Sequence, residues 1–391
     1  MPDISKKTFI WAIISLIVLR IILMILVMNN IPDTGMKTGG FRPAFTESYQ
    51  PDESQYFQLT RGLISGKAEK LVPNIGAPLV FAPLMYFAGA DSVAEFAPYV
   101  FIFQTFILFS LAIILVALIG YYLFNSRTLA LVSAFLFTIY PWLLLGFLKL
   151  IGYDNAIPAF HYQLWIFILS DYLSAFWVYL SFFLIFKWFK DIFESSAMNW
   201  GKLIALSAAS GAAVLTRVGN FWFILIIFVV FLYFWKLKKA INYSFFLGLV
   251  YLPQLIFNTV AFGAPWVFGY RDPSVGASTS SIALTEWFNP ENLWFNFSKF
   301  SPQYYFLLFL IAVAFFVFIF FFGYKYFSKT NKKFVVIAAA WFWSYLIFYG
   351  LFDESLSQLR YFLPAVPIFI YFFIASIIYI RQKLCLKKQN V

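Results

Sequence analysis

Two adjacent carboxylates, Asp52 and Glu53, stand at the head of the segment PDESQYFQLTRGLISGK, residues 51–67. Only 12% of the chain is charged, so paired acids just after a long hydrophobic run are unusual for this sequence. A carboxylate in such a place can take a proton from a reacting hydroxyl as a general base. The same residues can also stabilise the positive end of a helix. Both interpretations stay open from this segment alone.

Further charged residues stand at the ends of hydrophobic runs. Asp171 opens the run in LSDYLSAF, Arg217 ends AAVLTR, Arg271 follows NTVAFGAPWVFGY, and Arg360 precedes YFLPAVPIF. Arginine suits phosphate because its head is forked and permanently charged, although arginines at such places also reach toward the membrane interface. Three arginines and the acids together predict a site for an anionic phosphate beside a base.

A metal centre built on histidine or cysteine is not indicated. His161 is the one histidine and lies among aromatic residues, and Cys385 is the one cysteine. No second such ligand is available to complete a set. A divalent cation held by carboxylates stays open, and the sequence indicates no other cofactor.

The segment after Pro51 has the features of a short helix. Asp52 would be its N-cap, Gln55 its capping-box partner and Gly66 its C-terminal residue. Apolar residues recur at helical spacing, which predicts an amphipathic helix lying in the membrane interface with its apolar face down; these residues are Tyr56, Leu59, Leu63 and Ile64.

The elements that must position these residues are membrane helices. Hydrophobic residues make up 62% of the chain and aromatic residues 23%, which predicts an all-α polytopic membrane protein. Runs of about 20 apolar residues predict ten spans near 8–28, 97–124, 128–149, 171–189, 203–218, 219–235, 241–258, 303–324, 334–352 and 361–380. The run 77–90 is short and contains Pro78 and Pro83, so we interpret it as a second interfacial helix.

Charge predicts the sidedness of the spans. Basic residues dominate the segments 1–7, 125–127, 187–202, 236–239, 325–333 and 381–388. The positive-inside rule places these segments and both termini in the cytoplasm. The long segments 29–96 and 259–302 are then extracytoplasmic, and 1–391 is one transmembrane domain without a soluble C-terminal domain. The net charge of +11 follows from this topology and is therefore not the footprint of a nucleic-acid partner. Membrane lipids are the expected surroundings and partners of the spans.

The order of these motifs resembles a known family. PDESQYFQLTRGLISG, LSDYLSAF, AAVLTR, FNTVAFGAPWVFGY and LRYFLPAVPIF follow one another along most of the chain. In this order and sidedness they are similar to the GT-C type of polytopic membrane glycosyltransferases, in the branch of the protein O-mannosyltransferases and the lipid A aminoarabinose transferase. The resemblance implies transfer of a sugar from a polyprenyl-phosphate donor to a hydroxyl of a lipid-linked, glycan or protein acceptor. It implies an extracytoplasmic active site in a prokaryotic plasma membrane.

The resemblance also implies roles for single residues. The acid of the first outer loop, the base in that family, matches Asp52, with Glu53 beside it. Asp171 matches the acid that opens a later span, with Asp154 as the alternative because the segment 150–170 is long. The basic residues that match are Arg217 and, as a contact to the donor phosphate, Arg360.

A polyprenyl phosphate leaves readily, so one base on the acceptor and cations on the phosphate suffice for an inverting single displacement. A transporter or flippase of a lipid-linked saccharide is the alternative function. A carrier requires charged groups within the spans or on both faces of the membrane, and here Arg20 is nearly the only ionisable residue within a span. A non-catalytic assembly subunit is a third interpretation.

Overall fold

The computed structural model describes residues 3–27, 31–32, 41–42, 51–71, 73–150, 168–267, 269, 303–351 and 359–389. The regular secondary structure of this part of the chain is helical apart from β1 (Ile31–Pro32) and β2 (Phe41–Arg42), which pair antiparallel. Its α-helices are α1 (Lys6–Val27), α2 (Pro51–Ile64), α3 (Gly76–Ala88), α4 (Val93–Ile102), α5 (Phe109–Phe124), α6 (Arg127–Leu150), α8 (Asp171–Lys187), α9 (Trp200–Thr216), α10 (Phe221–Tyr233), α11 (Leu237–Phe262), α14 (Gln303–Thr330), α15 (Lys332–Leu351) and α16 (Val366–Gln389). Shorter elements are the π-helices η1 (Phe103–Leu108) and η3 (Lys190–Glu194) and the 3₁₀-helices η4 (Val218–Asn220) and η8 (Leu359–Ala365).

Every hydrophobic run predicted as a span overlaps a helix. In the described part of the chain, four helical stretches are long and apolar enough to cross a membrane: Lys6–Leu26, Val93–Phe124, Leu237–Phe262 and Phe362–Cys385. The short run at 77–90 forms α3, whose 13 residues extend about 20 Å at 1.5 Å per residue, less than a bilayer core. The chain is therefore a membrane protein by its helices, while the number of crossings stays a prediction.

The chain divides into two compact units, and the first is held together by aromatic packing. This unit comprises residues 1–17, 113–140 and 284–391. Phe320 of α14 packs against Phe342 of α15 and Phe372 of α16, with ring centroids 4.3 and 4.4 Å apart. A Cβ on Gly323 would lie 2.8 Å from the Phe372 carbonyl oxygen, so α14 and α16 approach closely because residue 323 has no side chain.

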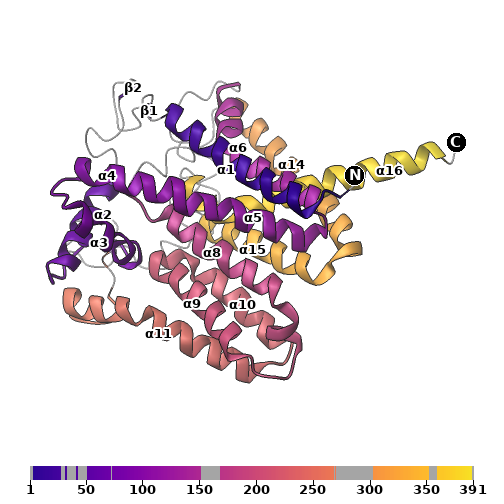
Figure 1. Ribbon diagram of the computed structural model, residues 1–391. Helices are drawn as coiled ribbons and strands as arrows, with labels where there is room; N and C mark the ends of the chain where they lie inside the picture. Colours follow the sequence, from indigo (N-terminus) through magenta and orange to yellow (C-terminus); the bar gives the residue numbers. More distant parts are fainter. Residues whose placement is uncertain are drawn as a thin grey trace. The chain divides into compact units, whose positions relative to one another are not determined.

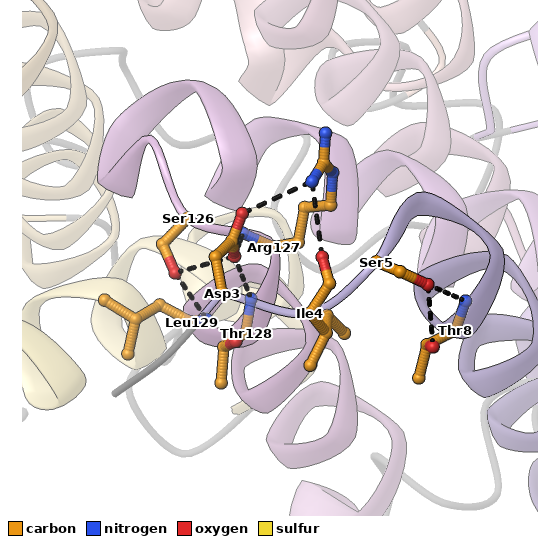
Figure 2. A network of polar contacts seen from close by, with 8 residues as sticks. All are labelled: Asp3, Ile4, Ser5, Thr8, Ser126, Arg127, Thr128 and Leu129. Atoms are coloured by element: carbon orange, nitrogen blue, oxygen red, sulfur yellow. Dashed lines mark hydrogen bonds and ion pairs between the residues drawn. The ribbon is translucent and has the colours of Figure 1, made fainter.

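A network of polar contacts in the first unit joins the N-terminal residues to the start of α6 (Figure 2). The Asp3 Oδ1 atom accepts hydrogen bonds from the backbone N–H groups of Arg127 at 2.7 Å and Thr128 at 3.2 Å. The Arg127 guanidinium also donates to Asp3 Oδ2 at 3.4 Å. Asp3 therefore caps a helix that lies far away in the sequence.

The second unit, residues 18–112 and 141–283, contains the predicted site residues that the structure describes in full. Helix α9 packs against both α8 and α11, which Figure 1 shows in magenta to orange. A Cβ on Gly211 of α9 would lie 2.8 Å from the Val250 Cβ of α11, so the small residue permits close helix packing.

Helix α2 begins two residues earlier than predicted, since an N-cap at Asp52 places the first helical residue at Glu53. Pro51 is its first residue, so Asp52 lies in the first turn and is not the N-cap. Proline is favoured at this first position because its missing N–H would have no partner there. The predicted C-terminal glycine is confirmed: Gly66 has φ +70°, and the Lys67 N–H donates to the Gly62 carbonyl at 2.7 Å.

The apolar face of α2 is covered by protein. Leu59 is buried in a cluster with residues of α9 and α11, and Tyr56 is buried as well. The interpretation of this stripe as a membrane-facing surface is therefore wrong for its central residues. The other members of the buried cluster are Ile75, Leu215, Phe257 and Ala261.

Candidate active site

The first turn of α8 and the C-cap residue of α9 meet in a buried ion pair. Asp171 is the first residue of α8 and Arg217 is the C-cap of α9, and the Arg217 Nη1 atom donates to Asp171 Oδ1. The Asp171 side chain is 4% exposed and the Arg217 side chain 21%. Asp171 is not an N-cap, because Ser170 holds that position without a side-chain capping bond. Sequence reasoning found both residues but not their contact, since they lie 46 positions apart.

Asn220 fixes the turn that follows Arg217. Its Nδ2 atom donates to the Ser174 Oγ atom and to the Ala213 carbonyl, both at 2.7 Å. Arg217 itself has extended backbone angles, φ −152° and ψ 116°, so the chain leaves α9 there and enters the 3₁₀ turn η4. Because Asn220 is fully buried, these bonds are shielded from water and hold the ends of α8 and α9 together.

Helix α2 is joined to the segment before α8 by two side chains. The Glu53 Oε1 atom accepts a hydrogen bond from the Ile168 N–H at 3.0 Å, and the Tyr56 hydroxyl donates to Ser170 Oγ at 2.6 Å. Glu53 is 2% exposed and Tyr56 is also buried. The sequence indicated no role in the site for Tyr56 or Ser170, because a tyrosine on the apolar face of a helix is typical of a hydrophobic core.

Burial raises the pKa of Tyr56 well above its usual value, and the nearby carboxylates of Asp171 and Asp52 raise it further. The Ser170 hydroxyl and the Arg217 guanidinium act in the opposite direction. The phenol thus stays protonated and keeps donating to Ser170 at any physiological pH.

Asp52 lies on the same helix as Glu53 in a different environment. It is half-buried, whereas Glu53 is fully buried. Consecutive residues of an α-helix point about 100° apart, so one acid faces the protein interior while its neighbour stays partly accessible. Of the two, only Asp52 combines contact with solvent and a position in the first turn of α2.

The residues that lead into α3 and its first residue, Gly76, lie tightly against the end of α9. A Cβ on Gly76 would lie 2.5 Å from the Leu215 carbonyl carbon and oxygen, so only glycine fits there. Asn74 Nδ2 donates to the Val214 carbonyl at 3.3 Å, and the Ile75 N–H donates to Gln254 Oε1 at 2.9 Å. The segment 74–76, which follows α2, is therefore held in a fixed position against the end of α9 within this unit.

The remaining predicted site residues are not placed. Arg271 and the alternative acid Asp154 lie outside the described residues, as does His161, which was not assigned to the site. Arg360 belongs to η8, but its side chain is not described. Among the described residues, no group of three or more histidine, cysteine, aspartate or glutamate side chains is arranged to hold a metal ion.

Arg20 is a buried cation of the second unit. The sequence showed it as a charged residue within a predicted span but indicated no role for it in the site. It lies within α1 and is 1% exposed. Its guanidinium carbon is 4.0 Å from the centroid of the Phe109 ring and 4.4 Å from that of Trp142. These cation–π contacts stabilise a charge that would be costly in an apolar environment.

Comparison with solved structures shows which known fold the chain shares. No protein-family model matches the chain, and no curated protein matches its sequence. Solved structures do match. The crystal structure of ArnT from Cupriavidus metallidurans bound to undecaprenyl phosphate is 13% identical, with a TM-score of 0.53, over 95% of this chain and 60% of that chain.

Two structures of an archaeal oligosaccharyltransferase from Archaeoglobus fulgidus match as well. The complex of AglB with an inhibitory peptide and a dolichol-phosphate has a TM-score of 0.55 and 12% identity, over 99% of this chain and 52% of that chain. The apo form has a TM-score of 0.52 and 12% identity, over 97% and 52%. The chain spans about half to three fifths of the length of these proteins, and it shares the fold of these GT-C glycosyltransferases.

Proposed function

We propose that the chain is a glycosyltransferase that moves a sugar from a polyprenyl-phosphate donor to a hydroxyl acceptor on the extracytoplasmic face of the membrane. The observation that carries the proposal is the docking of α2, with Asp52 and Glu53, on the end of α8 where Asp171 pairs with Arg217. Structures with the same fold hold undecaprenyl phosphate or a dolichol-phosphate, which supports a lipid-linked donor. The acceptor is a lipid-linked sugar, a glycan or a protein.

The reaction is a single displacement at the anomeric carbon. Asp52, the half-buried acid, takes the proton of the acceptor hydroxyl as the new glycosidic bond forms. The bond from the anomeric carbon to the phosphate oxygen breaks, and the electron pair leaves on polyprenyl phosphate. Because that anion is already stable, the leaving group requires cations more than a proton donor. No covalent intermediate forms, so the configuration inverts.

Arg217 is our proposed contact to the departing phosphate. Its ion pair with Asp171 gives Asp171 the role of orienting the guanidinium, in place of a direct part in proton transfer. Arginine retains further N–H donors in its planar fork when one of them binds a carboxylate. Arg360 and Arg271 are further candidates for the phosphate.

The experiment is a transfer assay with the purified chain in lipid nanodiscs. A panel of radiolabelled undecaprenyl- and dolichyl-phosphate sugars is incubated with a lipid and glycan extract of the source organism. We expect one donor to be consumed, with label in a new product and unlabelled polyprenyl phosphate released in equal amount. The panel includes a hexose, a pentose and an aminosugar donor. If every donor in it remains intact, the proposal is contradicted.

A carrier of lipid-linked saccharides keeps one observation in its favour, the buried Arg20 within α1. A charge within a span is the feature that a carrier uses. The two functions separate in proteoliposomes loaded with a fluorescent polyprenyl-phosphate sugar. Movement of the intact donor between leaflets without cleavage indicates a carrier, and cleavage indicates a transferase.

A further inference from the structure

The two adjacent acids of α2 have different surroundings, which argues for different roles. Glu53 is 2% exposed and its Oε1 atom is engaged by the Ile168 N–H at 3.0 Å. Asp52 is half-buried. A buried carboxylate that already accepts a backbone hydrogen bond gives up that bond if it rotates toward another group. Glu53 is thus poorly suited to approach an acceptor hydroxyl, whereas the half-buried Asp52 is partly accessible to one.

Glu53 shares its helix face with Tyr56 and Leu59, at intervals of three residues. Tyr56 donates to Ser170 Oγ at 2.6 Å, and Leu59 is fully buried. The partners of the first two, Ile168 and Ser170, lie two residues apart in the segment that leads into α8. Side chains three apart on a helix lie on one face, so both bonds form together when α2 takes this one position.

We propose that Glu53 and Tyr56, with Ile168 and Ser170, form a latch that positions Asp52, and that Glu53 is not the base. The role of Asp52 in this statement rests on the proposed function; the latch itself does not. The latch fixes the first turn of α2 against the residues immediately before Asp171. Asp52 is thereby held at a fixed position relative to the Asp171–Arg217 pair. The distance between Asp52, the proposed proton acceptor, and Arg217, the proposed phosphate contact, then stays constant.

The position of the latch explains why a glutamate stands there. A shorter side chain on the same turn of α2 would not extend as far from the helix backbone toward the Ile168 N–H. Glutamine has the same length and keeps a carbonyl oxygen that can accept the bond, whereas alanine cannot. The pair of substitutions Glu53→Gln and Glu53→Ala therefore separates the hydrogen bond from the charge.

The first test measures the latch without any activity. Hydrogen–deuterium exchange of peptides covering 51–60 and 168–173 is compared for the parent chain, Glu53→Gln, Glu53→Ala and Tyr56→Phe in nanodiscs. Loss of a buried hydrogen bond to a charged group should speed local opening about ten- to a hundredfold. We expect this in Glu53→Ala in both peptides, a smaller increase in Tyr56→Phe, and near-parent exchange in Glu53→Gln.

Exposed residues supply the controls. Glu69→Gln and Tyr86→Phe change the same residue types at exposed positions and should leave exchange of both peptides unchanged. Parent-like exchange at 168–173 in Glu53→Ala would overturn the latch. Because Glu53→Gln and Tyr56→Phe nearly preserve volume, they keep the test valid if Glu53→Ala fails to fold.

The second test uses the donor identified by the transfer assay. We expect Glu53→Gln to keep kcat within about tenfold of the parent with an unshifted pH–rate profile, and Glu53→Ala to lower kcat with little change in KM. A loss of two or more orders of magnitude in Glu53→Gln with parent-like exchange would show that Glu53 is the base, and would overturn the role given to it. If no donor is used at all, the proposed function fails, while the exchange result still decides the latch.

Discussion

A carboxylate–guanidinium pair in the first unit and one in the second differ in burial. In the first unit, Asp3 and Arg127 have side chains that are 44% and 35% exposed, and Asp3 also caps α6 through backbone N–H groups. In the second unit, Asp171 and Arg217 are 4% and 21% exposed. The exposed pair is an ordinary surface contact, where ion pairs contribute about 0–1 kcal/mol. The buried pair has lost much of its hydration, and the cost of that loss can exceed the attraction between the two charges, so the pair is weak evidence of a role in stability.

The largest expected effect comes from breaking the buried pair. Arg217→Met leaves the Asp171 carboxylate buried beside an apolar side chain, which typically costs about 3–5 kcal/mol. Arg127→Met is the matched control at the exposed pair and should cost about 1 kcal/mol or less. Reversible unfolding by titration with sodium dodecyl sulfate, followed by tryptophan fluorescence, measures both variants. If Arg217→Met and Arg127→Met lower the free energy of unfolding by the same amount, the buried and the exposed pair do not differ as described.

A second variant sharpens the comparison by removing both charges. Asp171→Leu combined with Arg217→Met should regain most of the lost stability, to within about 1–2 kcal/mol of the parent, because apolar replacement of a buried pair is often nearly neutral. Transfer should nevertheless stay low, since the phosphate has lost its proposed contact. Parent-like transfer in a stable double variant would show that the pair is structural only.

Sequence patterns predicted the elements of this site better than its contacts. Gly66 could be recognised as the end of α2 because a left-handed residue favours glycine, and its φ of +70° confirms it. The start of α2 was misplaced by two residues because Pro51 suits the first helical position and Asp52 suits the N-cap. The stripe with Tyr56 and Leu59 predicted a covered face, but periodicity does not reveal whether lipid or protein covers it.

The pairings that assemble the site lie beyond what the sequence can indicate. Asp171 and Arg217 are 46 residues apart, and Glu53 and Ile168 are 115 apart. Their contacts depend on how α2, α8 and α9 pack, and no local pattern encodes that packing. Gly76 shows the same limit, since only the nearby Leu215 backbone explains why a side chain is excluded there.

The smallest expected effect is the acid sensitivity of the exposed pair. Partial desolvation raises the pKa of Asp3, but the lowering effects are larger, so the pKa lies below its ordinary value of 3.8. They are the backbone hydrogen bonds from Thr128 and Arg127 and the positive charge of Arg127. A lowered pKa means that the stabilising contact is present above pH 3.8 and is lost as the pH falls through the lower folded-state value.

Hydrogen exchange of the amides at 126–129, corrected for the intrinsic effect of pH, should therefore stay constant from pH 7 to about pH 4 and increase only below that. Asp3→Asn is the control, because its side chain does not titrate. An increase in exchange already near pH 5 would contradict the lowered pKa of Asp3.

The most direct test of the account is Asp52→Asn in the transfer assay. Asparagine has the size of aspartate but cannot take a proton, and at a position in the first turn of α2 the lost helix-dipole interaction costs only about 0.3–1 kcal/mol. We predict a variant that unfolds nearly like the parent, binds the polyprenyl phosphate of the donor identified in the transfer assay equally well, and transfers sugar about two to four orders of magnitude more slowly. Transfer at the parent rate by folded Asp52→Asn would contradict the central claim that this carboxylate is the base.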